Sequence, residues 1–84
     1  MAPQLTPEES ATAQQQTDQS LRVAEANLGR FRGRTLTPAQ SEMAGKTRDF
    51  IRQARDAARE KDWIRARNLA EKAQLLSEEL LRTL

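Results

Sequence analysis

The sequence contains no cysteine, no histidine and no tyrosine. The absence of cysteine excludes disulfides and thiol nucleophiles, and the joint absence of cysteine and histidine excludes the common zinc sites. Histidine is also the usual general base of enzymes that work near neutral pH. The acidic residues form no paired acid–base arrangement, and no serine or lysine has a base within plausible reach. We therefore expect no catalytic residue, no metal or cofactor site and no enzyme activity.

Long apolar runs are also missing. No stretch approaches the roughly 18 apolar residues that a membrane-spanning helix requires, and the N-terminus lacks a basic segment followed by an apolar run. We therefore expect neither a membrane span nor an export signal. Apolar residues make up 37% of the 84-residue chain, and many of them are alanine. A chain of this size and composition predicts a compact core with no pocket for a small-molecule substrate.

Two segments carry almost the same helix-start signal. Residues 6–9 read Thr-Pro-Glu-Glu and residues 37–40 read Thr-Pro-Ala-Gln. In each segment the threonine hydroxyl can accept a hydrogen bond from the backbone N–H of the third helical residue, whose Glu or Gln side chain can reach back to the N-cap. Proline fits the first helical position because that N–H has no partner within the helix. Both segments therefore predict the start of a helix.

The pattern predicts three helices, over about 7–32, 38–60 and 62–84. Gly33 is well placed to end the first helix in a left-handed conformation, and Asp62 is well placed to cap the third. The links between the helices are short, so consecutive helices should be antiparallel neighbours. No alternating β-branched segment favours strands. The sequence therefore predicts an all-α, antiparallel three-helix bundle.

We expect one domain over 6–84, preceded by a flexible tail over 1–5. Apolar residues recur every three or four positions, which is typical of helices with one buried face. The first half of the first helix is polar on all sides, so we expect it to fray, project beyond the bundle or pair with another chain. The residues expected to face the interior are Ser10, Gln14, Thr17, Leu21, Ala24, Leu28, Phe31, Ala39, Met43, Ala44, Thr47, Phe50, Ile51, Ala54, Ala57, Ala58, Trp63, Ala66, Leu69, Ala70, Ala73, Leu76, Leu80 and Leu84.

Residues 50–78 resemble a single tetratricopeptide-type helical hairpin. That family places an aromatic residue and then a small one on the first helix, an acidic–aromatic turn, and then alanine, a larger residue and alanine down the second helix. The residues at these positions are Phe50, Ala54, Asp62, Trp63, Ala66, Ala70 and Ala73. The chain departs from the pattern at Gln53, where an aliphatic residue is usual, at Ala57, where a large aromatic residue is usual, and at Ala70, which is small. No proline follows Leu76, and the chain has no second copy of the hairpin. The resemblance therefore implies a close-packed hairpin and not the peptide-binding groove of a repeat array.

The run Arg-Asn-Leu-Ala-Glu-Lys-Ala over residues 67–73 follows a capped helix, and the whole is similar to uncharacterised helical tails of bacterial envelope proteins. This resemblance implies a bacterial protein of the cell envelope, in the periplasm.

Basic residues gather in the middle of the chain. Residues 21–67 carry twelve bases and six acids, whereas residues 1–20 carry three acids and no base. On the second predicted helix a 4-3-4 spacing places four guanidiniums on one outward ridge. This candidate polyanion ridge consists of Arg48, Arg52, Arg55 and Arg59. Together with Arg30, Arg32 and Arg34, it can engage phosphates or an acidic partner.

The competing interpretation of the ridge is a solvated helix face. Asp49, Asp56 and Glu60 lie beside the arginines, and Arg52 and Asp56 have the i,i+4 spacing of an intrahelical ion pair. We expect no exposed aromatic residue among the arginines to stack on bases. Nucleic acid is therefore the less favoured partner.

A few apolar residues fall outside the predicted interior faces. Ile64 and Leu75 share one line of the third helix, and Val23 and Ala26 face away from the core stripe of the first. Two helices that each carry a second apolar line suggest a docking surface, although single exposed apolar residues are common. We treat these four residues as candidate partner contacts, and we interpret Trp63 as a core residue at a tight turn.

Two hypotheses for function follow. The first is a non-catalytic interaction or structural module that self-associates or docks to a protein partner through the outer faces of the first and third helices. The alternative is a weak binder of polyanions, either nucleic acid or acidic protein, through the arginine ridge.

Overall fold

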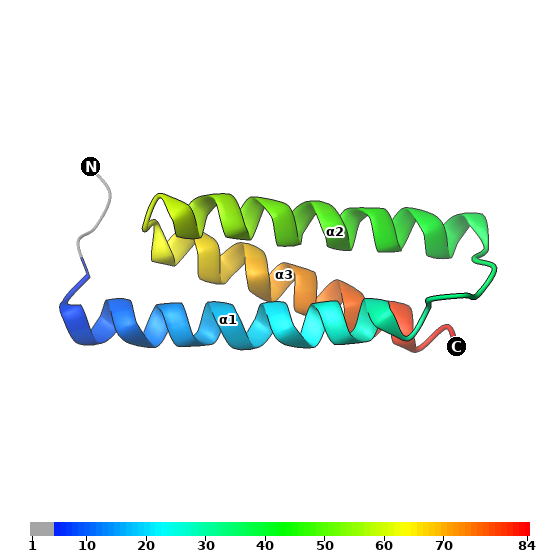
Figure 1. Ribbon diagram of the computed structural model, residues 1–84, viewed down its shortest axis with the longest axis horizontal. Helices are drawn as coiled ribbons and strands as arrows, with labels where there is room; N and C mark the ends of the chain where they lie inside the picture. The colour runs from blue at the N-terminus through cyan, green and yellow to red at the C-terminus, as the bar shows by residue number, and fades with distance from the viewer. Residues whose placement is uncertain (1–4) are drawn as a thin grey trace.

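The computed structural model describes residues 5–84 and shows three helices (Figure 1): α1 (Pro7–Gly29), α2 (Pro38–Arg59) and α3 (Trp63–Leu81). Within this part of the chain there is no strand. The bundle is long and narrow, with extents of 45 × 20 × 17 Å. The prediction of an all-α three-helix bundle is therefore confirmed. The predicted tail over 1–5 lies outside the described residues except for Leu5, which is half-buried.

Both predicted helix starts form complete capping boxes. The Thr6 N–H donates to Glu9 Oε1 at 3.0 Å, and the Glu9 N–H donates to Thr6 Oγ1 at 3.1 Å. Thr37 and Gln40 exchange the equivalent bonds at 2.9 and 3.1 Å. The hydrogen bond from the Thr6 backbone favours the ionised carboxylate and lowers the pKa of Glu9 below its usual value. Local sequence thus fixes where α1 and α2 begin.

The helix ends differ from the prediction by a few residues. α1 ends at Gly29 rather than near 32, because the N–H groups of Arg30 and Phe31 bond to carbonyls only three residues earlier. Phe31 lies in this tightened turn and is buried, at 6% exposure. Gly33 does adopt the predicted left-handed conformation (φ 76°), beyond the end of the helix.

The third helix is shorter than predicted for a similar reason. α3 ends at Leu81, since the last three N–H groups bond three residues back and the Thr83 hydroxyl donates to the Leu80 carbonyl at 2.6 Å. Leu84, which was predicted to face the interior, is 50% exposed.

The turn between α2 and α3 is closed by a lysine. Lys61 has a φ of 60°, in the left-handed region that usually favours glycine. Its N–H bonds to the Ala58 carbonyl, and the Asp62 N–H bonds to the Ala57 carbonyl, each at 2.9 Å. These two bonds form the Schellman arrangement that satisfies the last carbonyls of a helix. The Asp62 side chain then accepts from the Arg65 N–H and caps α3, as predicted.

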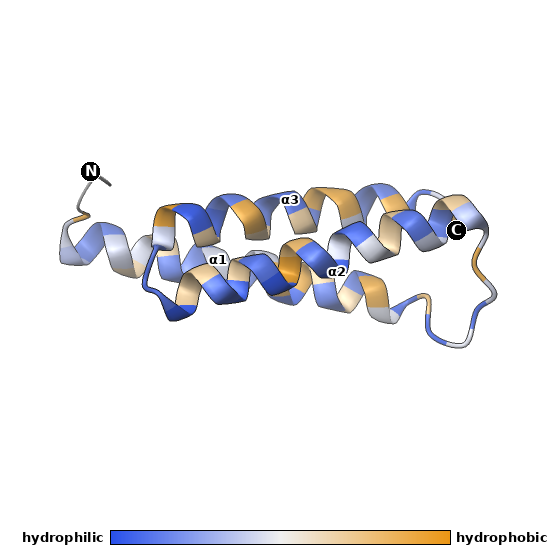
Figure 2. Ribbon diagram, turned by 90° about the horizontal axis from the view of Figure 1, so that it is seen from above, coloured by the Kyte–Doolittle hydropathy of each residue, from blue (hydrophilic) through white to orange (hydrophobic). Residues whose placement is uncertain are grey.

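α3 is the central element of the packing. It lies along both α1 and α2, whereas α1 and α2 touch each other at few points. In Figure 1, α3 lies behind the other two helices, and α2 runs antiparallel to both of its neighbours. The view from above in Figure 2 agrees, and it shows polar and apolar residues alternating around each helix. Both views also show the first turns of α1 projecting past the turn between α2 and α3.

Alanine allows α3 to lie close to both neighbours. Ala24, Ala54, Ala66, Ala70 and Ala73 are all 0% exposed. Three buried hydroxyl residues complete this interior, and each bonds to a carbonyl of its own helix: Thr17 to Ala13 at 2.7 Å, Thr47 to Met43 at 2.9 Å and Ser77 to Gln74 at 2.7 Å. Within residues 5–84 every buried side-chain nitrogen and oxygen atom has a hydrogen-bond partner.

Two further interior positions were predicted wrongly. Gln14 is exposed and Ala13 is buried in its place, because the polar first half of α1 offered no apolar periodicity from which to choose. Ala39 is also exposed, since it lies in the first turn of α2.

The α2–α3 hairpin brings together the residues on which the tetratricopeptide resemblance rests. Its alanines are buried, while Phe50 and Trp63 are half-buried. The ammonium of Lys72 lies 5.9 Å from the centre of the Phe50 ring. These contacts do not test the tetratricopeptide resemblance, which stays a prediction.

Candidate functional site

The sparse contact between α1 and α2 leaves a groove between them, with a volume of about 400 Å³. We call it the arginine groove. Its α1 side consists of Glu25, Leu28 and Gly29, with Arg32 just beyond the helix. Its α2 side consists of Arg48, Ile51, Arg52, Arg55 and Arg59. All four predicted ridge arginines therefore line one site, and they form a wall of a groove rather than a free ridge.

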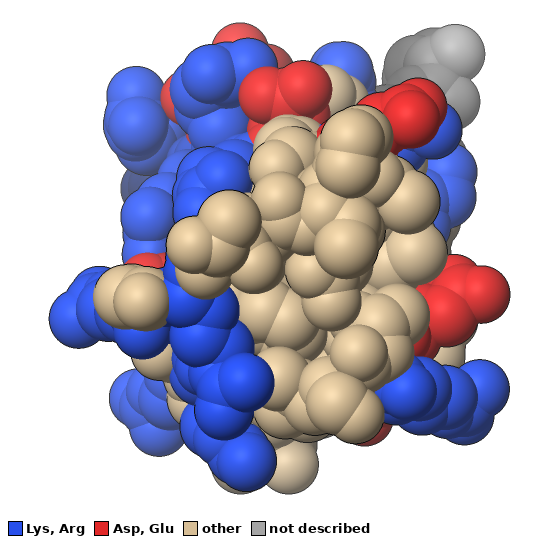
Figure 3. Space-filling view, turned by 90° about the vertical axis from the view of Figure 1, so that its right-hand side faces the viewer, with Lys and Arg blue, Asp and Glu red and all other residues tan. Residues whose placement is uncertain are grey.

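The charge of the groove follows from the helical repeat. The 4-3-4 spacing of the α2 arginines places them on one face, and Arg32 approaches from the opposite wall. Arg30 and Arg34, which were predicted to join them, do not line the groove. Five arginines and one carboxylate, that of Glu25, thus line the groove. In the end-on view of Figure 3, Lys and Arg crowd the left-hand side, which is the side that faces the viewer in Figure 1.

Three groove arginines form ion pairs. Arg52 pairs with Asp49 at 2.8 Å and Arg59 with Asp56 at 3.3 Å, both within α2. The predicted pair between Arg52 and Asp56 is wrong. Helical side chains lean toward the N-terminus, so each arginine reaches back to the acid three residues before it rather than forward.

The third ion pair joins the two walls. Arg55 of α2 donates to the carboxylate of Glu25 on α1, and both side chains are about half exposed, at 50% and 47%. Arg32 and Arg48 make no ion pair within residues 5–84. The groove therefore holds one carboxylate of its own and two guanidiniums that remain available to another anion.

The innermost residues of the groove are apolar. Ile51 is 6% exposed and Leu28 is half-buried, and both pack in the core beside α3. Leu28 and Ile51 were predicted as interior residues, but Glu25 was not recognised as a site residue. One signal could have identified it: Glu25 directly follows the buried Ala24, at the edge of the core stripe, from which a long side chain reaches a neighbouring helix.

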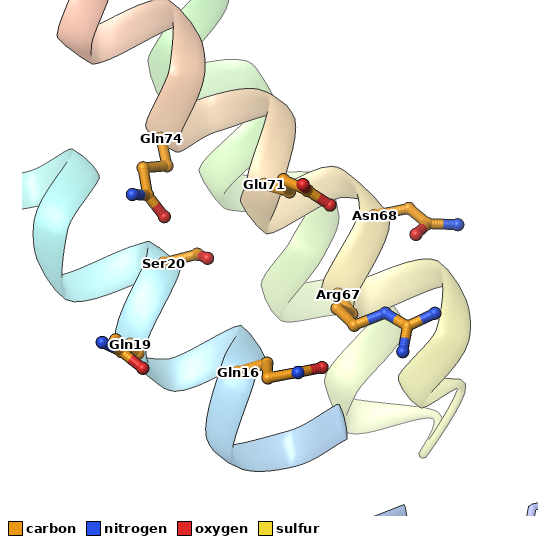
Figure 4. A pocket seen from close by; sticks show the side chains of 7 residues that line it. All are labelled: Gln16, Gln19, Ser20, Arg67, Asn68, Glu71 and Gln74. Carbon is orange, nitrogen blue, oxygen red and sulfur yellow. The ribbon is translucent and has the colours of Figure 1, made fainter. Parts of the chain in front are cut away.

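A second groove, of about 480 Å³, lies between α1 and α3 (Figure 4). Its lining residues are Gln16, Gln19, Ser20, Arg67, Asn68, Glu71 and Gln74. In Figure 4, Ser20 and Gln74 lie on facing helices, while Asn68 points away from α1. Amides and one charge of each sign give this groove no preference for cations or anions.

The four candidate partner contacts differ in their exposure to solvent. Leu75 is 59% exposed and Ala26 is exposed, but Val23 and Ile64 are half-buried. Ile64 lies in a hollow with Leu5 and Ala13, where the first turns of α1 partly cover it. Of the two residues on the second apolar line of α3, only Leu75 is therefore exposed.

Within residues 5–84, no three acidic, histidine or cysteine side chains are placed to hold a metal ion. No helix in the same range has the length and apolar character needed to cross a membrane. No protein family model, curated protein or solved structure matches this chain.

Proposed function

We propose that this chain is a non-catalytic binding module that docks an acidic protein partner in the arginine groove. The observation that carries the proposal is the convergence of five arginines on one groove with a single carboxylate among them. A cleft lined by one sign of charge attracts the opposite charge and accelerates its association. The groove is also where the bundle leaves two helices partly unpacked against each other.

An acidic protein fits this groove better than nucleic acid does. The lining contains no aromatic side chain on which a base can stack. Three of its arginines already form ion pairs with carboxylates, those of Glu25, Asp49 and Asp56.

The test is binding of fluorescently labelled polyglutamate, measured by anisotropy at low and at moderate salt. We expect binding at low salt that weakens steeply as salt is added. The double variant Arg48→Gln/Arg52→Gln should weaken binding, and Arg65→Gln should not, because Arg65 is an exposed residue of α3 outside the groove. No binding at low salt, or equal losses in both variants, contradicts the proposal.

A second candidate function is self-association through the outer faces of α1 and α3, through Val23, Ala26, Ile64 and Leu75. The observation in its favour is the 59% exposure of Leu75. A stable interface usually buries about 1,200 Å² or more, so Leu75 needs support from its neighbours. Light scattering of Leu75→Glu tests it: a wild-type mass above that of the monomer, lost in the variant, supports self-association, and an unchanged mass removes it.

A further inference from the structure

We infer that the occupant of the arginine groove is an amphipathic acidic helix of a partner protein, which docks by displacing Glu25 from Arg55. This inference deepens the proposed function and rests on it. It concerns the shape of the partner and the contact that the partner replaces.

The length of the arginine wall suits a helix. Arg48 and Arg59 are eleven residues apart, which corresponds to about 16 Å of α2, or about three turns. α1 and α2 both pack on α3 and contact each other little. A helix laid along the groove would contact α1 and α2 on the side opposite α3 and complete a four-helix arrangement.

The order of apolar and charged residues across the groove specifies the sequence pattern of the partner helix. Leu28 and Ile51 form an apolar floor between charged walls. A docking helix would therefore place leucines or similar residues on the floor. Its carboxylates would lie on the two flanks of this apolar face, where they meet the arginines. An extended acidic chain would satisfy the arginines but would offer no continuous apolar face to the exposed part of Leu28.

Glu25 already shows the contact that a partner carboxylate would make. It reaches from α1 to Arg55 on the opposite wall, and the pair is the only one between helices within residues 5–84. Because both side chains are about half exposed, the pair is weak and exchanges readily for another carboxylate. Glu25 thus acts as an internal competitor for the groove.

The experiment compares Glu25→Gln with Asp18→Asn. Both variants remove one negative charge from α1, but Asp18 lines a different surface hollow. The probe is a synthetic three-turn helical peptide with leucines on one face and glutamates on its flanks. A scrambled peptide of the same composition, polyglutamate and polyuridylic acid serve as comparison probes.

We expect Glu25→Gln to tighten binding of the amphipathic peptide by about two- to fivefold, the range that a weak surface ion pair allows. Asp18→Asn should bind as the wild type does. Circular dichroism of both variants confirms that each is folded before binding is compared.

The outcomes separate the inference from the proposed function. If polyglutamate binds but the scrambled peptide binds as tightly as the amphipathic one, the helical partner is wrong and the acidic partner stands. If Glu25→Gln leaves the affinity unchanged, displacement of Glu25 is wrong. Preference for polyuridylic acid over every acidic peptide overturns the inference in favour of nucleic acid, and failure of all probes overturns both proposals.

Discussion

The seams that α3 forms with its neighbours differ from the one between α1 and α2. α3 meets α1 and α2 through alanines and hydroxyl residues that are fully buried, such as Ala66, Ala70 and Ser77. α1 and α2 face each other across arginines that are exposed, including Arg52 and Arg55. Small side chains let helix backbones approach, whereas long charged ones hold them apart and keep their charges in water. The buried faces along α3 therefore hold the bundle together, and the open seam between α1 and α2 is the candidate binding surface.

The groove between α1 and α3 and the arginine groove differ in their chemistry. The groove toward α3 is slightly larger, at about 480 against 400 Å³. It holds amides and balanced charges, whereas the groove toward α2 holds five arginines and one glutamate. Chemistry rather than size distinguishes the candidate site.

Overfilling a closed seam should have the largest effect on stability. Ala70 is 0% exposed and belongs to the central core cluster. Ala70→Leu adds three carbons where none fit, so we expect a loss of about 1–3 kcal/mol in the free energy of unfolding. Urea denaturation followed by circular dichroism measures it. Ala26→Leu, at an exposed position of α1, should change stability by less than about 0.5 kcal/mol. Equal losses in the two variants would mean that α3 is not tightly packed.

Removing the side-chain hydrogen bond between α1 and α3 should have a smaller effect on stability. The Asn27 side-chain amide donates to the Ser77 hydroxyl at 3.0 Å. Asn27→Ala should cost about 0.5–1.5 kcal/mol, the net value of a typical hydrogen bond. The matched control is Asn68→Ala on the exposed side of α3. If both asparagine variants unfold at the same urea concentration, the bond contributes nothing.

Breaking the ion pair across the open seam should change stability less than Ala70→Leu or Asn27→Ala. The pair between Glu25 and Arg55 is about half exposed, so Glu25→Gln should cost less than about 0.5 kcal/mol, and less still at high salt. Thermal denaturation at two salt concentrations measures this. A loss as large as that of Ala70→Leu would show that the two helices depend on the pair, and the seam would then not be open.

Acid should weaken the cap of α1 without acting on either seam. The hydrogen bond from the Thr6 backbone lowers the pKa of Glu9 below the usual 4.5 in the folded chain. A lowered pKa gives stability that is present above 4.5 and lost as the pH falls through the lower folded value. Glu9→Gln should therefore reduce the loss of helicity on acidification in that window. Glu8→Gln is the control, since Glu8 is not part of the capping box; an identical acid response in both variants contradicts the assignment.

The parts of the fold that local chemistry determines could be predicted from the sequence. The two threonine–proline starts and the cap at Asp62 depend on residues within one turn, so all three helix starts were predicted correctly. The core stripe of α2 was largely correct because apolar residues recur there with a clear helical period. In the first half of α1 the period is absent, so Ala13 could not be distinguished from Gln14.

The candidate site could be predicted only in part. The four arginines of α2 were identified from their spacing, since they belong to one helix. The groove depends on how far α1 stands from α2, and a helical pattern does not say which pair of helices will be close. The pairing of Glu25 with Arg55 joins residues 30 apart in the sequence, beyond the reach of i,i+4 reasoning. Ile64 was predicted to lie on an outer face because the helical pattern of α3 does not show that the first turns of α1 lie beside it.

The most direct test of the account is an NMR titration of the methyl-labelled protein with the amphipathic acidic peptide. Leu28 and Ile51 lie on the floor of the arginine groove, and Leu75 lies outside it on the exposed side of α3. We predict that the methyl signals of Leu28 and Ile51 shift in proportion to the bound peptide while those of Leu75 stay in place. Shifts confined to Leu75, or no shift at Leu28 and Ile51 at saturating peptide, would contradict the claim that the open seam between α1 and α2 is the binding surface.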